Sequence, residues 1–170
     1  DDRARALIVE NENLRAGITE LLGEEAYHPD GSYNRTFVAS VVFAQPEKLA
    51  ALNALVHPAV ETDSLSWHEA MKAAGHAYTI KEAALMIESG AYHFLDYLVV
   101  VTAPEEVRVQ RVIQRDGLSE NEVYARIKRQ MPEAEKLVLA DFTIVNDGTK
   151  ALTPQVWALH RRFTALSGTS

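Results

Sequence analysis

The segment from Arg111 to Gly148 constrains the fold of this chain more than any other part. It starts in a helical pattern, continues through Ser119-Glu-Asn-Glu122, and ends with the apolar run Phe142–Val145 before Asn-Asp-Gly. A serine followed three residues later by glutamate is the pattern of a helix capping box. The short apolar run is typical of a strand, and Asn-Asp-Gly is a turn sequence. We therefore expect a helix, a mobile lid, a second helix, a strand and a turn in this order.

Two further segments have the composition of strands. Tyr97–Thr102 reads YLVVVT without polar alternation, which favours a parallel strand covered on both faces. Ala77–Glu82 is also short and rich in β-branched and aromatic residues, so we expect a strand there too. A helix start follows at Thr102-Ala-Pro-Glu. Strands that alternate with helices indicate an α/β domain.

The segment between Leu14 and Ala74 is helical throughout by pattern and suggests an insertion in this domain. Leu14, Ile18 and Leu22 share one helix face that stops at Gly23. Because Pro58 lacks a backbone donor, we expect the helix to bend or restart at His57-Pro58. The expected helices here run over residues 34–44, 46–56 and 60–74, after a first helix at residues 3–8.

Composition excludes some classes of function. A chain of 170 residues with a net charge of -7 is unsuited to broad binding of nucleic acid or anionic membranes. A small phosphorylated ligand remains possible, because a few local arginines can outweigh a distant negative surface. The chain has no cysteine, so disulfides, thiolate zinc sites and cysteine nucleophiles are excluded. No apolar run approaches the length of a membrane span. We expect a cytoplasmic protein, either a monomer or a weak homo-oligomer.

Several segments together resemble the dephospho-coenzyme A kinase family. They are DDRAR at the start, LNALVHP at 52–58, EAALMIESG at 82–90, and RDGLSENEVYARIKRQMP with ADFTIVNDG. The resemblance covers essentially the whole chain. It implies an α/β fold with a P-loop NTPase-like parallel sheet flanked by helices, a helical acceptor-binding insertion and a lid, as in nucleoside monophosphate kinases. The core would comprise residues 1–10, 76–112 and 138–170, the insertion residues 11–75, and the lid residues 113–137.

The same resemblance implies a reaction. Members of the family phosphorylate the ribose 3′-hydroxyl of dephospho-coenzyme A with ATP and Mg²⁺, which is the final step of coenzyme A synthesis. The expected partners are therefore small-molecule substrates, with no nucleic acid and no membrane.

One part of the family pattern is missing from these residues. None of the eight glycines forms the GxxxxGK[ST] loop that cradles phosphates. In the family this loop follows a first strand at the centre of the sheet. We expect both to belong to a segment ahead of Asp1, and we expect the chain as given to have negligible activity.

The resemblance assigns nucleotide contacts to five residues. It places Arg111 against adenine and Arg115 on the phosphates, where Arg115 would act in catalysis, and it has Arg126 close over the transferred group. Arginine suits these roles because its planar guanidinium is always charged and makes forked contacts. The turn at Asn146 and Gly148 would meet the adenine edge. Arginines at such spacing also occur on ordinary solvated helix faces, so it is the family layout that favours function.

The remaining assignments concern the acceptor and the metal. Asp1 aligns with a carboxylate that accepts the hydroxyl proton or orders magnesium, although an aspartate there can also simply cap a helix. Arg35, Asn53 and His57 lie in the helical insertion, where the acceptor's adenine or phosphates would bind. His57 can instead satisfy the backbone broken by the neighbouring proline. Glu88 follows the apolar AALMI run at the expected edge of the active site.

Two other functions compete with the kinase. A non-catalytic module that binds coenzyme A or assists assembly would explain the missing loop but not the intact lid. Another small-molecule kinase of the same fold is disfavoured by LNALVHP.

Overall fold

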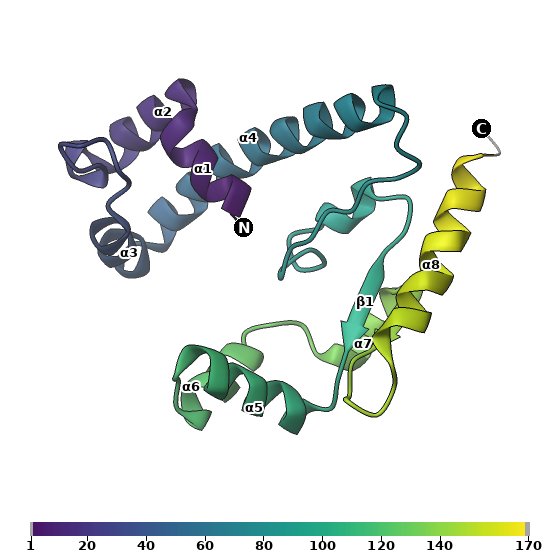
Figure 1. Ribbon diagram of the computed structural model, residues 1–170. Helices are drawn as coiled ribbons and strands as arrows, with labels where there is room; N and C mark the ends of the chain where they lie inside the picture. The colour runs from purple at the N-terminus through teal and green to yellow at the C-terminus, as the bar shows by residue number, and fades with distance from the viewer. Residues whose placement is uncertain (1, 169–170) are drawn as a thin grey trace. The chain divides into compact units, whose positions relative to one another are not determined.

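The computed structural model describes residues 2–168 (Figure 1). The chain is divided into two compact units, with the boundary between Lys81 and Glu82. The first unit is helical and the second is α/β.

The first unit is a bundle of helices around one apolar core. It contains α1 (Asp2–Glu10), α2 (Glu12–Leu22), the 3-10 helix η1 (Glu24–Ala26), α3 (Arg35–Ala44) and α4 (Pro46–Ala73). Ile18 is fully buried at the centre of α2, with Leu14 and Leu22 on the same face, as the helical spacing predicts. Asn11 caps α2 and Asn34 caps α3 through side-chain oxygens that accept backbone N–H bonds. Gly23 ends α2 as expected, with a φ of 96°.

The loop before α3 is fixed to α1. Tyr27 and Tyr33 form an isolated antiparallel bridge, and their rings meet edge to face at 5.6 Å. The Tyr27 hydroxyl donates to the carbonyl of Ile8 at 2.8 Å. The guanidinium of Arg15 lies 4.6 Å from the centre of the Tyr27 ring. These contacts fix the place at which α3 begins.

The prediction of a helix break at His57-Pro58 is wrong. Helix α4 runs without interruption through Pro58 for 28 residues. A proline costs one backbone hydrogen bond, to the residue four positions earlier. Here both Ala54 and Pro58 are exposed, so water can reach the carbonyl that loses its donor. On the other side of the helix, Leu52 is buried and Leu55 and Val56 pack against the core, which holds the helix together.

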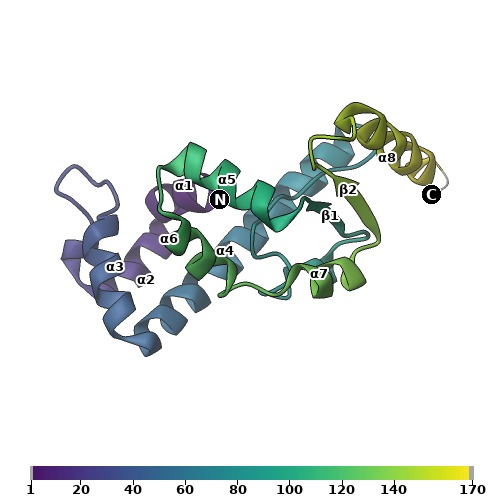
Figure 2. The same ribbon diagram turned by 90° about the horizontal axis from the view of Figure 1, so that it is seen from below.

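The second unit is built on two parallel strands. Its elements are η2 (Ala91–Phe94), β1 (Val99–Thr102), α5 (Glu105–Asp116), α6 (Glu120–Ile127), α7 (Glu133–Leu139), β2 (Phe142–Val145) and α8 (Leu152–Ser167). Strands β1 and β2 lie side by side, with Val99 opposite Phe142 and Thr102 opposite Val145 (Figure 2). Helix α8 packs on β2, where Phe163 contacts Phe142 and Tyr97. The predicted α/β class is confirmed.

The predicted strand at Ala77–Glu82 is absent from the structure. A strand forms only where a neighbouring strand accepts and donates its backbone bonds. Among residues 2–168 no strand pairs with this segment, and Ile80 within it is 73% exposed. Within the segment, the Thr79 hydroxyl lies 2.8 Å from His68 Nδ1, at hydrogen-bond distance. The β-branched composition was therefore insufficient to form a strand without a neighbouring strand to pair with.

No helix among the described residues is long and apolar enough to cross a membrane.

Candidate nucleotide and acceptor site

Arg111 is held against the turn that follows β2. Helix α5 buries Val109 almost completely, which turns Arg111 to the exposed side. Its Nη1 donates to the main-chain carbonyl of Asn146 at 2.7 Å. The Asn146 N–H in turn donates to the carbonyl of Thr102 at 2.7 Å, one residue beyond the strand pairing. The structure thus brings together Arg111 and Asn146, which are 35 residues apart in the sequence.

Gly148 forms an open turn next to this pair. Its φ of 86° lies in the left-handed region, and a Cβ there would meet nothing within 4 Å. Asp147 Oδ1 accepts backbone bonds from Thr149 at 2.8 Å and Lys150 at 3.1 Å. These N–H groups, first that of Thr149, hold the pKa of Asp147 below its ordinary value. The turn therefore has a fixed shape and an accessible main chain beside Arg111.

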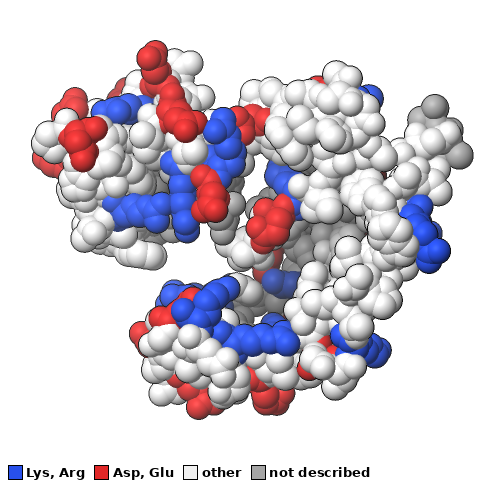
Figure 3. Space-filling model, viewed as in Figure 1, with Lys and Arg blue, Asp and Glu red and all other residues white. Residues whose placement is uncertain are grey.

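Arg115 and Arg126 meet at a shared carboxylate, that of Asp116. Arg115 binds it through two bonds, Nε to Oδ1 at 2.7 Å and Nη2 to Oδ2 at 3.1 Å. Arg126 approaches from α6, with its Nη1 3.6 Å from Oδ2. Basic side chains gather over α5 and α6, with acidic ones beside them (Figure 3). The two predicted phosphate-binding arginines are therefore close together and largely exposed.

Glu88 joins its own segment to the chain that leads into α7. Its Oε1 accepts from the Met131 N–H at 3.1 Å and pairs with Lys136 Nζ at 2.7 Å. The side chains of Glu88 and Lys136 are only 21% and 17% exposed. Burial alone would raise the pKa of Glu88, but the Lys136 and backbone bonds together lower it. Glu88 is thus ionised and fixed in place.

A hollow of about 440 Å³ lies beside Lys136 in the second unit. Its walls combine apolar residues of β1, such as Val100 and Val101, with the cationic residues Arg108, Lys128 and Lys136. Glu133 on its wall pairs with Arg108 and accepts from the Thr102 hydroxyl. Two of the three cations are therefore already neutralised by carboxylates, and only Lys128 has no ion-pair partner among the described residues.

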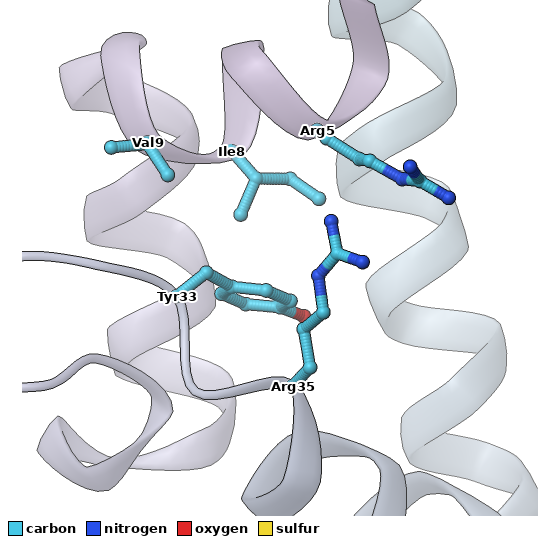
Figure 4. A pocket seen from close by; sticks show the side chains of 5 residues that line it. All are labelled: Arg5, Ile8, Val9, Tyr33 and Arg35. Carbon is cyan, nitrogen blue, oxygen red and sulfur yellow. The ribbon is translucent and has the colours of Figure 1, made fainter. Parts of the chain in front are cut away.

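The first unit contains a separate pocket of about 310 Å³ around Arg35. Arg35 is the first residue of α3, and Arg5 reaches the pocket from α1. Figure 4 shows Arg35 extending upward beside the Tyr33 ring and Arg5 extending from α1 on the same side of the pocket, with Ile8 between α1 and the Tyr33 ring. Burial raises the pKa of the Tyr33 hydroxyl, and the nearby charge of Arg35 works against that rise. Within residues 2–168, Arg35 has no carboxylate partner, whereas Arg5 pairs with exposed Asp2.

Asn53 and His57 occupy neighbouring turns of α4 and are both exposed. Neither side chain contributes to the packing of the bundle, so His57 does not repair the helix backbone beside Pro58 through a hydrogen bond within the described residues. Asp1, assigned to catalysis and to the metal, lies outside the described residues. In the part of the chain that is described, no three histidine or acidic side chains are arranged to hold a metal ion.

Sequence reasoning missed three residues that the structure places at these sites. Asp116 follows directly after Arg115, where a neighbouring opposite charge was a usable signal. Arg5 and Tyr33 line the Arg35 pocket, and nothing in their local spacing predicted that they would meet there. Arg5 stands four residues after Asp1 in the DDRAR segment, which was quoted only for its likeness to the family.

The parallel strand pair flanked by helices is an α/β architecture, and the solved structures that it resembles have the P-loop NTPase fold. The model of the dephospho-CoA kinase family matches residues 1–151. A dephospho-CoA kinase of Bacteroides fragilis is 33% identical over 94% of this chain and 76% of its own length. One of Salinibacter ruber is 36% identical over 88% and 75%. These matches place the chain in the dephospho-CoA kinase family, and it is accordingly a kinase, an enzyme of the transferase class.

Solved structures agree with this assignment. TT1252 from Thermus thermophilus superposes with a TM-score of 0.67 and 34% identity, covering 97% of this chain and 82% of that one. A dephospho-CoA kinase from Campylobacter jejuni gives a TM-score of 0.66 and 25% identity over 99% and 83%.

Proposed function

We propose that this protein transfers the γ-phosphoryl group of ATP to the ribose 3′-hydroxyl of dephospho-coenzyme A, the last step of coenzyme A synthesis. The family membership supports the reaction class. The observation that carries the proposal is the contact of Arg111 with the Asn146 carbonyl, because it fixes one arginine beside an open turn. Arg115 follows one helical turn further along the same helix.

On the nucleotide side, Arg111 lies against the adenine and the turn at Asn146 and Gly148 meets the edge of the base. Arg115 and Arg126 contact the phosphates. Phosphoryl transfer spreads negative charge over the oxygens of the moving group, so correctly placed guanidinium groups stabilise the transition state more than the ground state. The lid at residues 113–137 contains both arginines.

On the acceptor side, Arg35 binds a phosphate of the acceptor, and Arg5 and Tyr33 complete its pocket. The pocket combines two cations with an aromatic face, which suits a phosphate next to an adenine ring. Asn53 and His57 offer polar contacts from α4, and we assign Glu88 to the acceptor as well. We keep the helical segment 11–75 as the acceptor-binding insertion and residues 1–10, 76–112 and 138–170 as the core.

In the transfer step, the 3′-oxygen forms a bond to the γ-phosphorus while the bond from that phosphorus to the ADP oxygen breaks. The hydroxyl proton passes to a carboxylate, for which Asp1 is the candidate. Asp1, which lies outside the described residues, is also the candidate to order magnesium. Magnesium would arrive with the nucleotide, whose phosphates supply ligands for it.

The test uses the protein in the form that its gene encodes, incubated with ATP, Mg²⁺ and dephospho-coenzyme A. We expect ADP and coenzyme A in equal amounts, with NMR placing the new phosphate on the 3′-oxygen. Calorimetry with each substrate alone accompanies the assay. Binding of the acceptor without any turnover would replace the kinase proposal with a non-catalytic binding function. Turnover with other hydroxyl acceptors but not with this one would show a different small-molecule kinase.

A further inference from the structure

The carboxylate of Asp116 lies between the two arginines that the proposed function assigns to the phosphates. It forms two hydrogen bonds with Arg115 and a longer ion pair with Arg126. The side chain of Arg115 is 74% exposed, whereas that of Asp116 is 27% exposed. The acid is therefore the more enclosed partner, and the arginine extends outward from it.

The position of Asp116 contradicts the ordinary preferences of a helix. It is the last residue of α5. The C-terminal end of a helix carries a partial negative charge, so a negative side chain there is unfavourable. Neighbouring helical residues do not normally face each other, yet Arg115 folds back to bind the next residue. Local rules broken in this way are expected mainly at functional sites.

The connection between α5 and α6 is fixed at both ends. Gly117 closes α5 in the left-handed conformation, and its N–H donates to the carbonyl of Ile113 at 2.9 Å. Two residues later Ser119 and Glu122 form the predicted capping box of α6, with Glu122 Oε2 2.9 Å from the Ser119 N–H. A short connection with such caps holds the last turn of α6, and Arg126 with it, near Asp116.

The contact leaves most of the donors of both arginines free. A guanidinium has five N–H groups in a plane. Asp116 engages the Nε edge of Arg115, so the Nη1 group is available to a second anion. At 3.6 Å, Arg126 shares charge with Asp116 without a hydrogen bond, so its N–H groups stay available too. The hydrogen bond from Arg115, and to a lesser extent the charge of Arg126, keeps the pKa of Asp116 low.

We propose that Asp116 is a positioning residue that orients Arg115 and draws Arg126 toward it, so that their free N–H groups meet the γ-phosphoryl group during transfer. This inference rests on the proposed function. Asp116 does not touch the substrate; it acts mainly through Arg115, which it binds by two hydrogen bonds, and less through Arg126. A misplaced catalytic group costs far more in the rate of the chemical step than in substrate binding.

The experiment measures kcat and the KM of ATP for four proteins: the wild type, Asp116→Asn, Arg115→Ala and the double variant. Asparagine keeps the size of the side chain and loses the charge and one acceptor. We expect Asp116→Asn to lower kcat roughly tenfold or more and to change the KM of ATP less than about threefold. In the Arg115→Ala background the same change should have a much smaller effect, because only the longer contact with Arg126 remains for Asp116 to hold. Glu106→Gln, which removes an exposed acid from the first turn of α5, is the matched control and should behave as wild type.

Each other outcome contradicts the inference. Tighter ATP binding in Asp116→Asn would show that the carboxylate competes with the phosphates. An equal loss in both backgrounds, together with a lower melting temperature, would show a structural role alone. An unchanged kcat would exclude any role in transfer. If the wild type itself forms no coenzyme A in this assay, it is the proposed function that fails.

Discussion

Arg111 and Asn146 connect the middle of α5 to the end of β2 through one hydrogen bond of 2.7 Å between a guanidinium and a main-chain carbonyl. The bond uses a single N–H of Arg111 and leaves the plane of its guanidinium available for stacking. It also fixes the turn that leads to Gly148. Two residues assigned separately to the nucleotide from the sequence thus form one structural unit.

Replacing Arg111 should weaken ATP binding without changing the acceptor. We expect Arg111→Ala to raise the KM of ATP by about tenfold or more, since a hydrogen bond to a charged group contributes on the order of 1.5–3 kcal/mol. Lysine should recover only part of the loss because it cannot stack as a plane. Steady-state kinetics with each substrate varied in turn checks this, with Arg161→Ala in exposed α8 as the control. A change confined to the acceptor's KM would refute the assignment.

Replacing Arg35 should weaken binding of the acceptor and leave ATP binding unchanged, which is the reverse of the effect expected for Arg111. Among residues 2–168, Arg35 is the cation of this pocket that has no carboxylate partner. We therefore expect Arg35→Ala to raise the acceptor's KM about tenfold while the KM of ATP stays the same. Arg5→Ala should act in the same direction but less strongly, because Arg5 already shares its charge with Asp2. Calorimetric titration with dephospho-coenzyme A provides an independent measurement. Equal effects on both substrates would mean that this pocket does not distinguish them.

The ion pair between Glu88 and Lys136 should contribute to stability. Glu88→Gln leaves Lys136 largely buried without its carboxylate, and we expect a loss of about 1–2 kcal/mol in the free energy of unfolding. The double variant Glu88→Gln with Lys136→Met should recover part of that loss, because no unpaired charge remains. Denaturant titration measures both. Additive losses in the double variant would show that the two side chains act independently.

Substitution of Gly117 should destabilise the protein, because its backbone conformation favours glycine. Its φ is 68° and a Cβ would have open space around it, so any cost of Gly117→Ala comes from conformation and not from a clash. We expect a loss of about 1–2 kcal/mol in unfolding free energy, and a smaller loss for asparagine. Gly168→Ala is the matched control, since Gly168 has a φ of -82°. Equal stability of the two alanine variants would contradict the explanation.

Tyr27 should make the helical unit sensitive to alkaline pH. Burial raises the pKa of its hydroxyl from 10.0 to about 12. Its contribution is therefore complete below pH 10, the ordinary pKa of tyrosine, and is lost as the pH rises through about 12. We expect a loss on the order of 1–2 kcal/mol over that range from this residue. The unfolding free energy of Tyr27→Phe should change less with pH in this range. Its tyrosinate absorbance should show one tyrosine fewer among those that ionise at the high end of the titration.

Much of the fold could be predicted because it depends on local rules. The capping box at Ser119, the end of α2 at Gly23 and the strand at Phe142–Val145 all follow from residues close together in the sequence. The strand at β1 was predicted to be covered on both faces, but Val101 in it is 59% exposed, because among the described residues a second layer does not cover that face. This error and two others depend on distant partners. Ala77–Glu82 lacks a paired strand within the described residues, and α4 continues through Pro58 because its other face packs on the core.

In the candidate site, too, long-range contacts could not be predicted from the sequence. The resemblance to the family pointed to Arg111 and Arg115, since arginines at this spacing also occur on ordinary solvated helix faces. The contact of Arg111 with Asn146 and the meeting of Arg5 with Arg35 span long stretches of chain, so they were beyond any local rule. Asp116 was adjacent to a predicted residue, but helix geometry argues against a contact between neighbours, and so the pair was overlooked.

The uninterrupted helix α4 has a mechanical consequence. With 28 residues it extends about 42 Å at the usual rise of 1.5 Å per residue. A tilt of a few degrees at Pro46 therefore moves Ala73 by roughly 2–4 Å at that length. Pro58 inside this helix cannot donate a backbone hydrogen bond, and it stands next to His57. Thermal bending should therefore concentrate beside a side chain assigned to the acceptor.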